Sequence, residues 1–262
     1  MYTQVLDRPF SGQTTVARAS SAGFGPPSHA GSSPDTRLVG HLVGRLGVWP
    51  AASPLDIVVW PGRGVPAWDG GVWPALGVES PAGTVLSLAP GSFGDATSID
   101  RDVVRTALRS SDRADLVPAA LGRPDLHFGE AVFRWGERVV ALSEIGEWIA
   151  ANDRRSPNWV RPFGGDVLVA WSDQGTVAAG VGLKRHDRFA VELAVGTEPA
   201  HRGKRLARAL VAQASRKLLD QDILPLYLHE AGNAASARVA EAAGFPDQGW
   251  RIFWLAPSSS TP

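Results

Sequence analysis

Hydrophobic positions in the first half of the chain recur with the periods of strands and short helices. Apolar residues three or four positions apart predict helices over 37–48 and 99–108. Short runs rich in branched and aromatic residues predict strands at 55–60, 73–79, 84–88, 126–135 and 138–142. The sequence Ser-Pro-Ala-Gly at 80–83 is typical of a tight turn and predicts a hairpin. This half therefore has the elements of an α/β lobe and no motif that marks a site.

The second half of the chain alternates more clearly between strand and helix patterns. Apolar runs predict strands at 166–171, 177–184, 189–195, 225–229 and 251–255. Helical spacing predicts helices over 203–220 and 234–243, and 157–163 reads as a short helix or turn. Asn233 and Gly244 suit the two ends of the second helix, as N-cap and as the residue that stops it. The order strand-strand-strand-helix-strand-helix-strand predicts a mixed sheet flanked by helices.

The chain before these elements has a different composition. Residues 11–36 are rich in Ser, Gly and Pro and have few large apolar side chains, so they cannot offset the entropy of ordering. We therefore predict a disordered tail over 1–36, an N-terminal lobe at 37–142 and a second domain at 143–262.

Composition and charge narrow the classes of function. Lys and Arg total 26 and Asp and Glu total 26, so zero net charge argues against a protein that binds nucleic acid through a global field. The absence of cysteine excludes disulfides, thiolate nucleophiles and cysteine-ligated zinc. The six histidines show no metal-ligand spacing, so no metal is expected. No apolar run approaches the length of about 20 residues that crosses a bilayer, and no secretory signal core is present, so we expect a cytoplasmic protein with no membrane partner.

The segment at 191–211 carries the candidate chemistry. Arg202, Lys204 and Arg205 lie at the predicted start of a helix, where the positive end of the helix dipole opposes them. An anion bound there would be held by the free backbone N–H groups, the dipole and the arginines together, and Gly203 would let the backbone approach it. A solvated basic helix start remains the alternative. A nucleotide P-loop and a dinucleotide fingerprint fit less well, because their glycines and Gly-Lys-Ser/Thr ending are missing.

This segment resembles the acetyl-CoA signature of the GNAT N-acetyltransferases. The resemblance begins with Val195-Gly196-Thr197 and Pro199 and continues through the run Arg202-Gly203-Lys204-Arg205-Leu206-Ala207. The second family signature, N-x-x-S followed by a short helix and G-F, is matched by Asn233, Ser236, Gly244 and Phe245. The similarity covers about 166–255, and no motif match extends into 37–142.

The resemblance implies the fold class α/β (α+β): a GNAT-like mixed, twisted sheet flanked by helices, preceded here by the smaller α/β lobe and the tail. It also implies acetyl-CoA as acyl donor, with its pantetheine arm lying between the strands at 189–195 and 225–229. The cofactor-binding residues implied by position are Val195, Gly196, Thr197, Arg202, Gly203, Lys204, Arg205, Leu206, Ala207 and Asn233. The acceptor would be an amine of a small molecule or a protein, which attacks the thioester directly.

Two positions depart from the family pattern. Arg205 replaces the middle glycine of the signature, where it could add a phosphate contact. Ala240 stands where many relatives have the tyrosine that protonates the leaving thiolate. We therefore expect either a transferase that works without that acid, with the proton supplied by solvent or His229, or a catalytically degenerate acyl-CoA sensor.

Amine attack also needs a proton acceptor. Val191, Leu193 and Val195 alternate as a core face, so Glu192 points away from the core, toward the acceptor side or solvent. We predict Glu192 as the base, with His229 the next candidate and His186 after it. Each could instead be an ordinary surface residue.

The first half leaves several interpretations open. It is either a degenerate second copy of the same fold or an unrelated lobe that binds the acceptor. Four tryptophans could floor an acceptor pocket, although packing is the favoured reading: Trp49, Trp60, Trp68 and Trp73. A protein that binds nucleic acid or another partner through the basic turn is the third functional class, and a monomer or a homodimer is expected.

Overall fold

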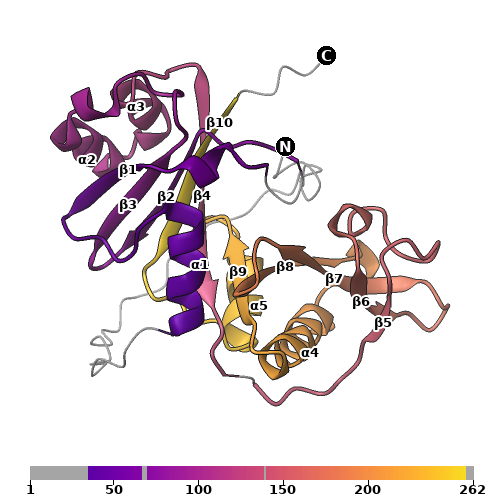
Figure 1. The fold of residues 1–262 in the computed structure, drawn as a ribbon. Helices are drawn as coiled ribbons and strands as arrows, with labels where there is room; N and C mark the ends of the chain where they lie inside the picture. The colour runs from indigo at the N-terminus through magenta and orange to yellow at the C-terminus, as the bar shows by residue number, and fades with distance from the viewer. Residues whose placement is uncertain (1–34, 67–69, 139, 258–262) are drawn as a thin grey trace, which may run out of the picture.

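The computed structural model describes residues 35–66, 70–138 and 140–257. In this part of the chain, ten strands form one mixed sheet in the order β1-β3-β2-β10-β4-β9-β8-β7-β6-β5 (Figure 1). The β1–β3 and β8–β9 pairs are parallel, and the other neighbours are antiparallel. A mixed sheet flanked by helices, as the sequence predicts, is therefore confirmed. Most of the predicted tail lies outside the described residues.

The first half of the chain supplies one end of the sheet and three helices. Its elements are α1 (Thr36–Leu46), β1 (Leu55–Val59), η1 (Pro61–Gly64), β2 (Ala75–Ser80), β3 (Gly83–Leu88), η2 (Ala96–Ser98), α2 (Arg101–Arg109), α3 (Arg113–Ala120) and β4 (Leu126–Trp135). The predicted hairpin joins β2 to β3, with Ser80 opposite Gly83.

The second half supplies the other end of the sheet. Its elements are β5 (Glu147–Ala150), η3 (Arg161–Phe163), β6 (Asp166–Trp171), β7 (Val177–Arg185), β8 (Ala190–Thr197), η4 (Pro199–His201), α4 (Leu206–Asp220), β9 (Leu224–His229), α5 (Ala234–Ala242) and β10 (Arg251–Pro257). The predicted strand and helix order of this half is confirmed, with β5 added before it.

The two halves are interwoven at the centre of the sheet. Strand β10, from the end of the chain, lies between β2 and β4, and β4 in turn pairs with β9. The buried Arg134 on β4 donates to the backbone oxygen of Phe245 (2.9 Å) and to Glu241 (3.1 Å) near the end of α5. The sheet therefore runs without a break across the predicted boundary at 142, and the division into two separate domains stays a prediction.

Helices cover the sheet on both faces. Helices α2 and α3 pack on the N-terminal strands, and α4 and α5 pack on β6 to β9. Along β4, Phe128 belongs to the α2–α3 core and Arg134 reaches α5, so both helix pairs lie on the same face. Helix α1 lies on the opposite face, across the join between the halves (Figure 1), where Leu38 and Leu42 pack near Leu226.

Helix α1 has well-defined ends. Asp35 accepts a hydrogen bond from the backbone N–H of Arg37 (2.8 Å), and Gly47 closes the helix in a left-handed conformation. Asp35 therefore caps α1 and Thr36 belongs to it, although the sequence assigned both residues to the tail.

Three local predictions differ from the structure. The predicted strand at 138–142 is wrong, because residues 138 and 140–142 form no strand as the chain leaves the sheet after Gly136. Helix α3 and strand β5 were not predicted, since α3 has no amphipathic period and contains Pro118, and β5 is only four residues long. Helix α4 begins at Leu206 and not at 203, because two residues before it have left-handed backbones.

The first half does not repeat the strand order of the second. Strands β6, β7 and β8 are neighbours in chain order, whereas β1 pairs in parallel with β3 and not with β2. The suggestion of a degenerate second copy therefore gains no support from topology and remains a hypothesis.

Candidate functional site

A gap opens between two parallel strands near the middle of the sheet. Strands β8 and β9 pair over only three positions, the last being Glu192 opposite Leu226. Beyond that pair, β8 continues to Thr197 and β9 continues to His229. The outer edge of β8 pairs with β7, and the outer edge of β9 pairs with β4. The inner edge of β8 from residue 193 onward therefore has no strand partner in the described part of the chain. Its backbone N–H and C=O groups are available to an extended ligand.

The start of α4 follows the open end of this gap. The N-cap residue is Arg205, whose φ of 64° is left-handed, and Gly203 has a φ of 78°. Within the described residues, no side chain caps the start of α4. The first N–H groups of this helix therefore have no side-chain hydrogen-bond acceptor. Arg205 thus adopts the conformation that the family's glycine would favour, and a helix N-terminus of this kind suits an anion.

Basic side chains surround this first turn. Arg202 Nε lies 3.4 Å from the backbone oxygen of Thr197, and Lys204 Nζ lies 3.4 Å from His201 Nδ1. Arg202, Lys204 and Arg205 are all exposed, as an interaction with a phosphate group would require. The structure therefore brings the sequence-predicted turn residues together at one edge of the gap.

The remaining predicted cofactor residues line the two strands and the second helix. Val195 packs toward the core beneath α4, together with Leu206. A Cβ on Gly196 would lie 2.7 Å from the ring of Trp159, so this glycine lets the ring cover the opposite face of β8. Asn233 accepts a hydrogen bond from the N–H of Ser236 (2.9 Å), which confirms it as the N-cap of α5.

Glu192 lies at the closed end of the gap, on the face opposite α4. Its neighbours Val191 and Leu193 pack in the core beneath α4, so the predicted orientation of its side chain is confirmed. It is buried and not solvent-facing, with Lys184 Nζ 2.6 Å and His186 Nε2 3.1 Å from its two oxygens. Burial alone would raise the pKa of Glu192, but Lys184 and His186 outweigh it and lower the pKa to about 2. The carboxylate is therefore ionised at neutral pH and is a weak proton acceptor.

His229 ends β9 on the other side of the gap. Its Nδ1 lies 2.8 Å from the backbone oxygen of Glu230, which can only accept, so Nδ1 carries the hydrogen. Burial lowers the pKa of His229, and its buried Nε2 has no partner among the described residues. The neutral ring therefore offers a lone pair and has no second proton to donate.

A packed alanine, Ala240, occupies the position at which many relatives have a tyrosine. Ala240, in the last turn of α5, is completely buried. The Tyr227 hydroxyl lies 2.9 Å from Ser236 Oγ, one helical turn before Ala240, and burial raises the pKa of this hydroxyl. A tyrosine hydroxyl on β9 therefore lies beside the helix turn from which the family's acid would project, a placement that no local sequence pattern indicated.

The side chains that contact the Glu192 carboxylate were not predicted from the sequence. Lys184 stands directly opposite Glu192 in the β7–β8 hairpin, and Asp187 in the turn bonds His41 on α1 at 2.6 Å. The hairpin register would have indicated the first pair, because the two residues are equidistant from the turn. The contact with α1 has no local signal.

The tryptophans of the first half mostly pack. Trp49 lies 5.1 Å from Trp250 and Trp73 lies 5.3 Å from Trp254, as ring centroids, so the packing interpretation holds for both. Trp60 donates to the backbone oxygen of Gly44 on α1. Trp68 lies outside the described residues.

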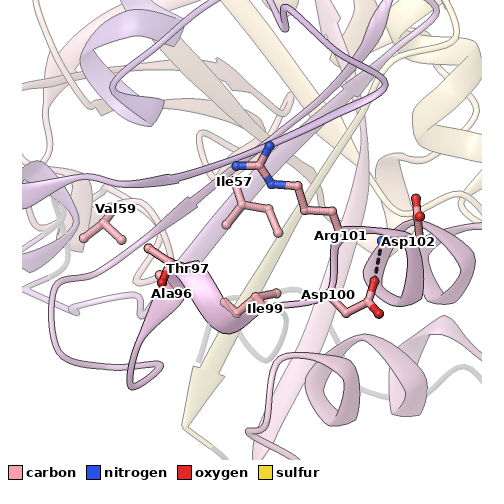
Figure 2. A pocket seen from close by; sticks show the side chains of 8 residues that line it. All are labelled: Ile57, Val59, Ala96, Thr97, Ile99, Asp100, Arg101 and Asp102. Atoms are coloured by element: carbon pink, nitrogen blue, oxygen red, sulfur yellow. Dashed lines mark hydrogen bonds between the residues drawn. The ribbon is translucent and has the colours of Figure 1, made fainter.

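A surface hollow lies away from the gap. It has a volume of about 600 Å³ and lies beside β1 and the start of α2. Its lining residues include Ile57, Ile99 and Arg101 (Figure 2). None of the predicted site residues lines it. Over the described ranges, no group of three or more His, Cys, Asp or Glu residues could hold a metal, and no helix is long and apolar enough to cross a membrane.

A comparison with protein-family models gives one match, which includes the gap. Residues 134–245 match the sequence model of the Acetyltransferase (GNAT) family. Curated proteins yield no match. Similar solved structures include an acetyltransferase from the GNAT family of Colwellia psychrerythraea, with 14% identity, a TM-score of 0.39 and coverage of 50% of this chain and 57% of that one.

Two further structures show comparable similarity. A GCN5-related N-acetyltransferase-like protein from Streptococcus suis has 18% identity and a TM-score of 0.39, with 56% of this chain and 69% of that chain covered. A tandem GNAT protein from the clavulanic acid biosynthesis pathway has 15% identity and a TM-score of 0.39, with coverage of 56% and 58%. Residues 134–245, which contain the gap and the basic turn, therefore form a domain of the acetyltransferase (GNAT) family.

Proposed function

We propose that the protein is an acetyl-CoA-dependent N-acyltransferase that moves an acetyl group to an amine of a small molecule or a protein. The observation that carries this proposal is the separation of β8 from β9 after three pairs, beside a basic helix start with no side-chain cap. An extended thioester arm would fit between the separated strands β8 and β9, and a diphosphate would fit at the basic start of α4.

The chain's own groups suggest how the cofactor would be held. The unpaired edge of β8 at Val195 and Thr197 would bond the pantetheine amides as a neighbouring strand does. The first turn of α4, with Arg202 and Arg205, would bind the phosphates. Asn233 already caps α5, and its side-chain N–H₂ would still be able to donate to the arm from the β9 side.

The reaction needs two proton movements. The amine nitrogen attacks the thioester carbonyl, the C–S bond breaks, and the nitrogen loses a proton while the thiolate gains one. Glu192, the base expected from the sequence, is bonded to both Lys184 and His186. For the second proton, Tyr227 is a better placed donor than His229, since the neutral His229 ring offers only a lone pair.

A non-catalytic acyl-CoA-binding module is the second candidate. The observation in its favour is Ala240, a buried methyl group at the position of the family's acid. Turnover separates the two functions, because a sensor would bind the cofactor without releasing its thiol.

The first experiment measures thiol release from acetyl-CoA with a panel of amines, using a thiol-reactive dye. The chain has no cysteine, so the protein contributes no background. Release that depends on both amine and protein supports the transferase. Cofactor binding without release from any amine transfers support to the sensor.

The second experiment tests the cofactor turn. Arg202→Glu should weaken acetyl-CoA binding at least tenfold in calorimetry, because a charge-assisted contact becomes a repulsion. Arg109→Glu, an equally exposed change on α2, is the matched control and should bind normally. Equal affinity of both variants and the wild type would show that the phosphates do not bind at this turn.

A further inference from the structure

A group of ionisable side chains lies on the sheet face opposite α4 and α5. It joins α1 to the β7–β8 hairpin and is called here the imidazole–carboxylate cluster: His41, Lys184, His186, Asp187 and Glu192. All five are buried or half-buried. The cluster lies at the closed end of the cofactor gap, because Glu192 belongs to the last residue pair before β8 and β9 separate.

The hydrogen bonds determine where the protons are. The Glu192 carboxylate is ionised and can only accept, so His186 Nε2, at 3.1 Å, must carry a hydrogen. A neutral His186 ring then has its lone pair on Nδ1. This Nδ1 atom is buried and has no partner within the part of the chain that the structure describes. The arrangement is that of a base oriented by a carboxylate.

The imidazole–carboxylate cluster carries a net negative charge that one more proton would neutralise. Asp187 and Glu192 contribute two negative charges and Lys184 one positive charge, so the net charge is −1 when both imidazoles are neutral. Protonation of one imidazole would neutralise the cluster. The negative charge would also attract the ammonium form of an amine acceptor.

The surroundings of His41 disfavour a proton on that ring. His41 is buried at 4% exposure, and burial lowers its pKa more than Asp187 raises it. Arg45, on the same helix, opposes a charge on His41 as well. His186 faces Glu192 from β8, Lys184 from β7 and the ring of His41 from α1, at 6.2 Å between centroids.

We propose that His186 is the catalytic base, accepting the acceptor amine's proton on Nδ1, and that Glu192 is a positioning residue. In this step the nitrogen lone pair of the amine forms the new C–N bond, the N–H bond breaks with its electron pair remaining on nitrogen, and the proton moves to His186 Nδ1. The C–S bond breaks with its electron pair going to sulfur, and the thiolate then takes up a proton. Glu192 holds the ring and stabilises the imidazolium, while Lys184 keeps Glu192 ionised. The inference rests on the proposed transferase function.

The kinetic experiment compares three variants in the thiol-release assay. His186→Gln keeps an N–H donor that can reach Glu192 but removes the basic nitrogen, and it should lower kcat 10²–10⁴-fold with acetyl-CoA affinity unchanged. Glu192→Gln should lower kcat less and move the acidic limb of the pH profile to lower pH, because the imidazolium loses its counter-charge. His127→Gln, at an exposed site on β4, is the control and should match the wild type.

A second measurement is independent of turnover. In ¹⁵N-histidine NMR spectra, with His186 assigned by its loss in His186→Gln, the neutral ring should carry its hydrogen on Nε2. A ring with its hydrogen on Nδ1 overturns the proposal, and His186→Asn provides the assignment if His186→Gln does not fold. Full kcat in a folded His186→Gln overturns it too and leaves the transferase intact, whereas a wild type that neither binds acetyl-CoA nor releases thiol removes the proposed function and this role with it.

Discussion

Replacing Arg205 by glycine is predicted to change stability and cofactor binding in opposite directions. Arg205 is the N-cap of α4, with a left-handed φ of 64° and no side-chain cap hydrogen bond. Its guanidinium is exposed beside the proposed phosphate site. Glycine adopts this conformation freely but has no charge, so Arg205→Gly should stabilise the protein without ligand and weaken acetyl-CoA binding.

The expected size follows from three contributions to the free energy of unfolding. A left-handed backbone costs a non-glycine residue about 1–2 kcal/mol. Removal of a positive charge from a helix N-terminus adds about 0.3–1 kcal/mol of stability. The greater freedom of glycine in the unfolded chain subtracts about 0.4–1 kcal/mol. The balance is about 1 kcal/mol in favour of glycine, or about 2–4 °C in Tm for a protein of this size.

The expected loss of binding is larger. A hydrogen bond from a charged group contributes about 1.5–3 kcal/mol. Its removal should raise the Kd for acetyl-CoA by about tenfold to hundredfold.

Arg205→Ala is the matched control for this pair of effects. It removes the same charge but keeps a Cβ in the left-handed conformation, so it should lose the same affinity without the gain from backbone relief. Tryptophan fluorescence in urea gives the stability of each variant, and calorimetry gives its affinity. Equal stability of the glycine and alanine variants would refute the left-handed conformation, and wild-type affinity of Arg205→Gly would refute the phosphate contact.

Three further predictions test other parts of the chain. Glu192→Gln should destabilise the protein at neutral pH by up to about 3–5 kcal/mol, because it removes the buried negative charge that lies 2.6 Å from Lys184 Nζ. Since the pKa of Glu192 is lowered from 4.5 to about 2, its contribution is full above pH 4.5 and is lost as the pH falls toward 2, so urea midpoints of the variant should fall less steeply with acid. Deletion of residues 1–34 should leave the melting temperature unchanged, whereas deletion of 1–36 also removes the Asp35 cap and should cost about 1 kcal/mol; equal melting of both truncations contradicts this. Ala240→Tyr should destabilise by at least about 1–3 kcal/mol by overpacking a fully buried site, and an unchanged denaturation midpoint would show that space is available there.

The sequence by itself determined the elements whose signals are local. The predicted bounds of β4 and β6 agree with the observed strands, because an apolar run bounded by turn residues defines a strand without reference to the rest of the chain. The ends of α5 follow from Asn233 and Gly244 for the same reason. The basic turn before α4 was also found, since its residues are consecutive and belong to a recognisable signature.

Only the tertiary structure decided which strands are neighbours. Strand β4 lies between β9 and β10, and β10 also pairs with β2, so the two halves that the sequence separates share one sheet. These pairings join residues between 91 and 180 positions apart, and an apolar strand carries no code for its distant partner. The left-handed Arg205 is a smaller case, since its backbone is imposed by the loop around it.

The chemistry of Glu192 was likewise settled by packing. Its direction off the strand follows from the alternation of Val191 and Leu193, and that prediction is confirmed. Whether the carboxylate meets solvent or a cation depends on which side chains fold over it, and here Lys184 and His186 do so. The pKa of a carboxyl responds to charges within a few ångströms in space, and those neighbours are brought there by the hairpin register and by α1.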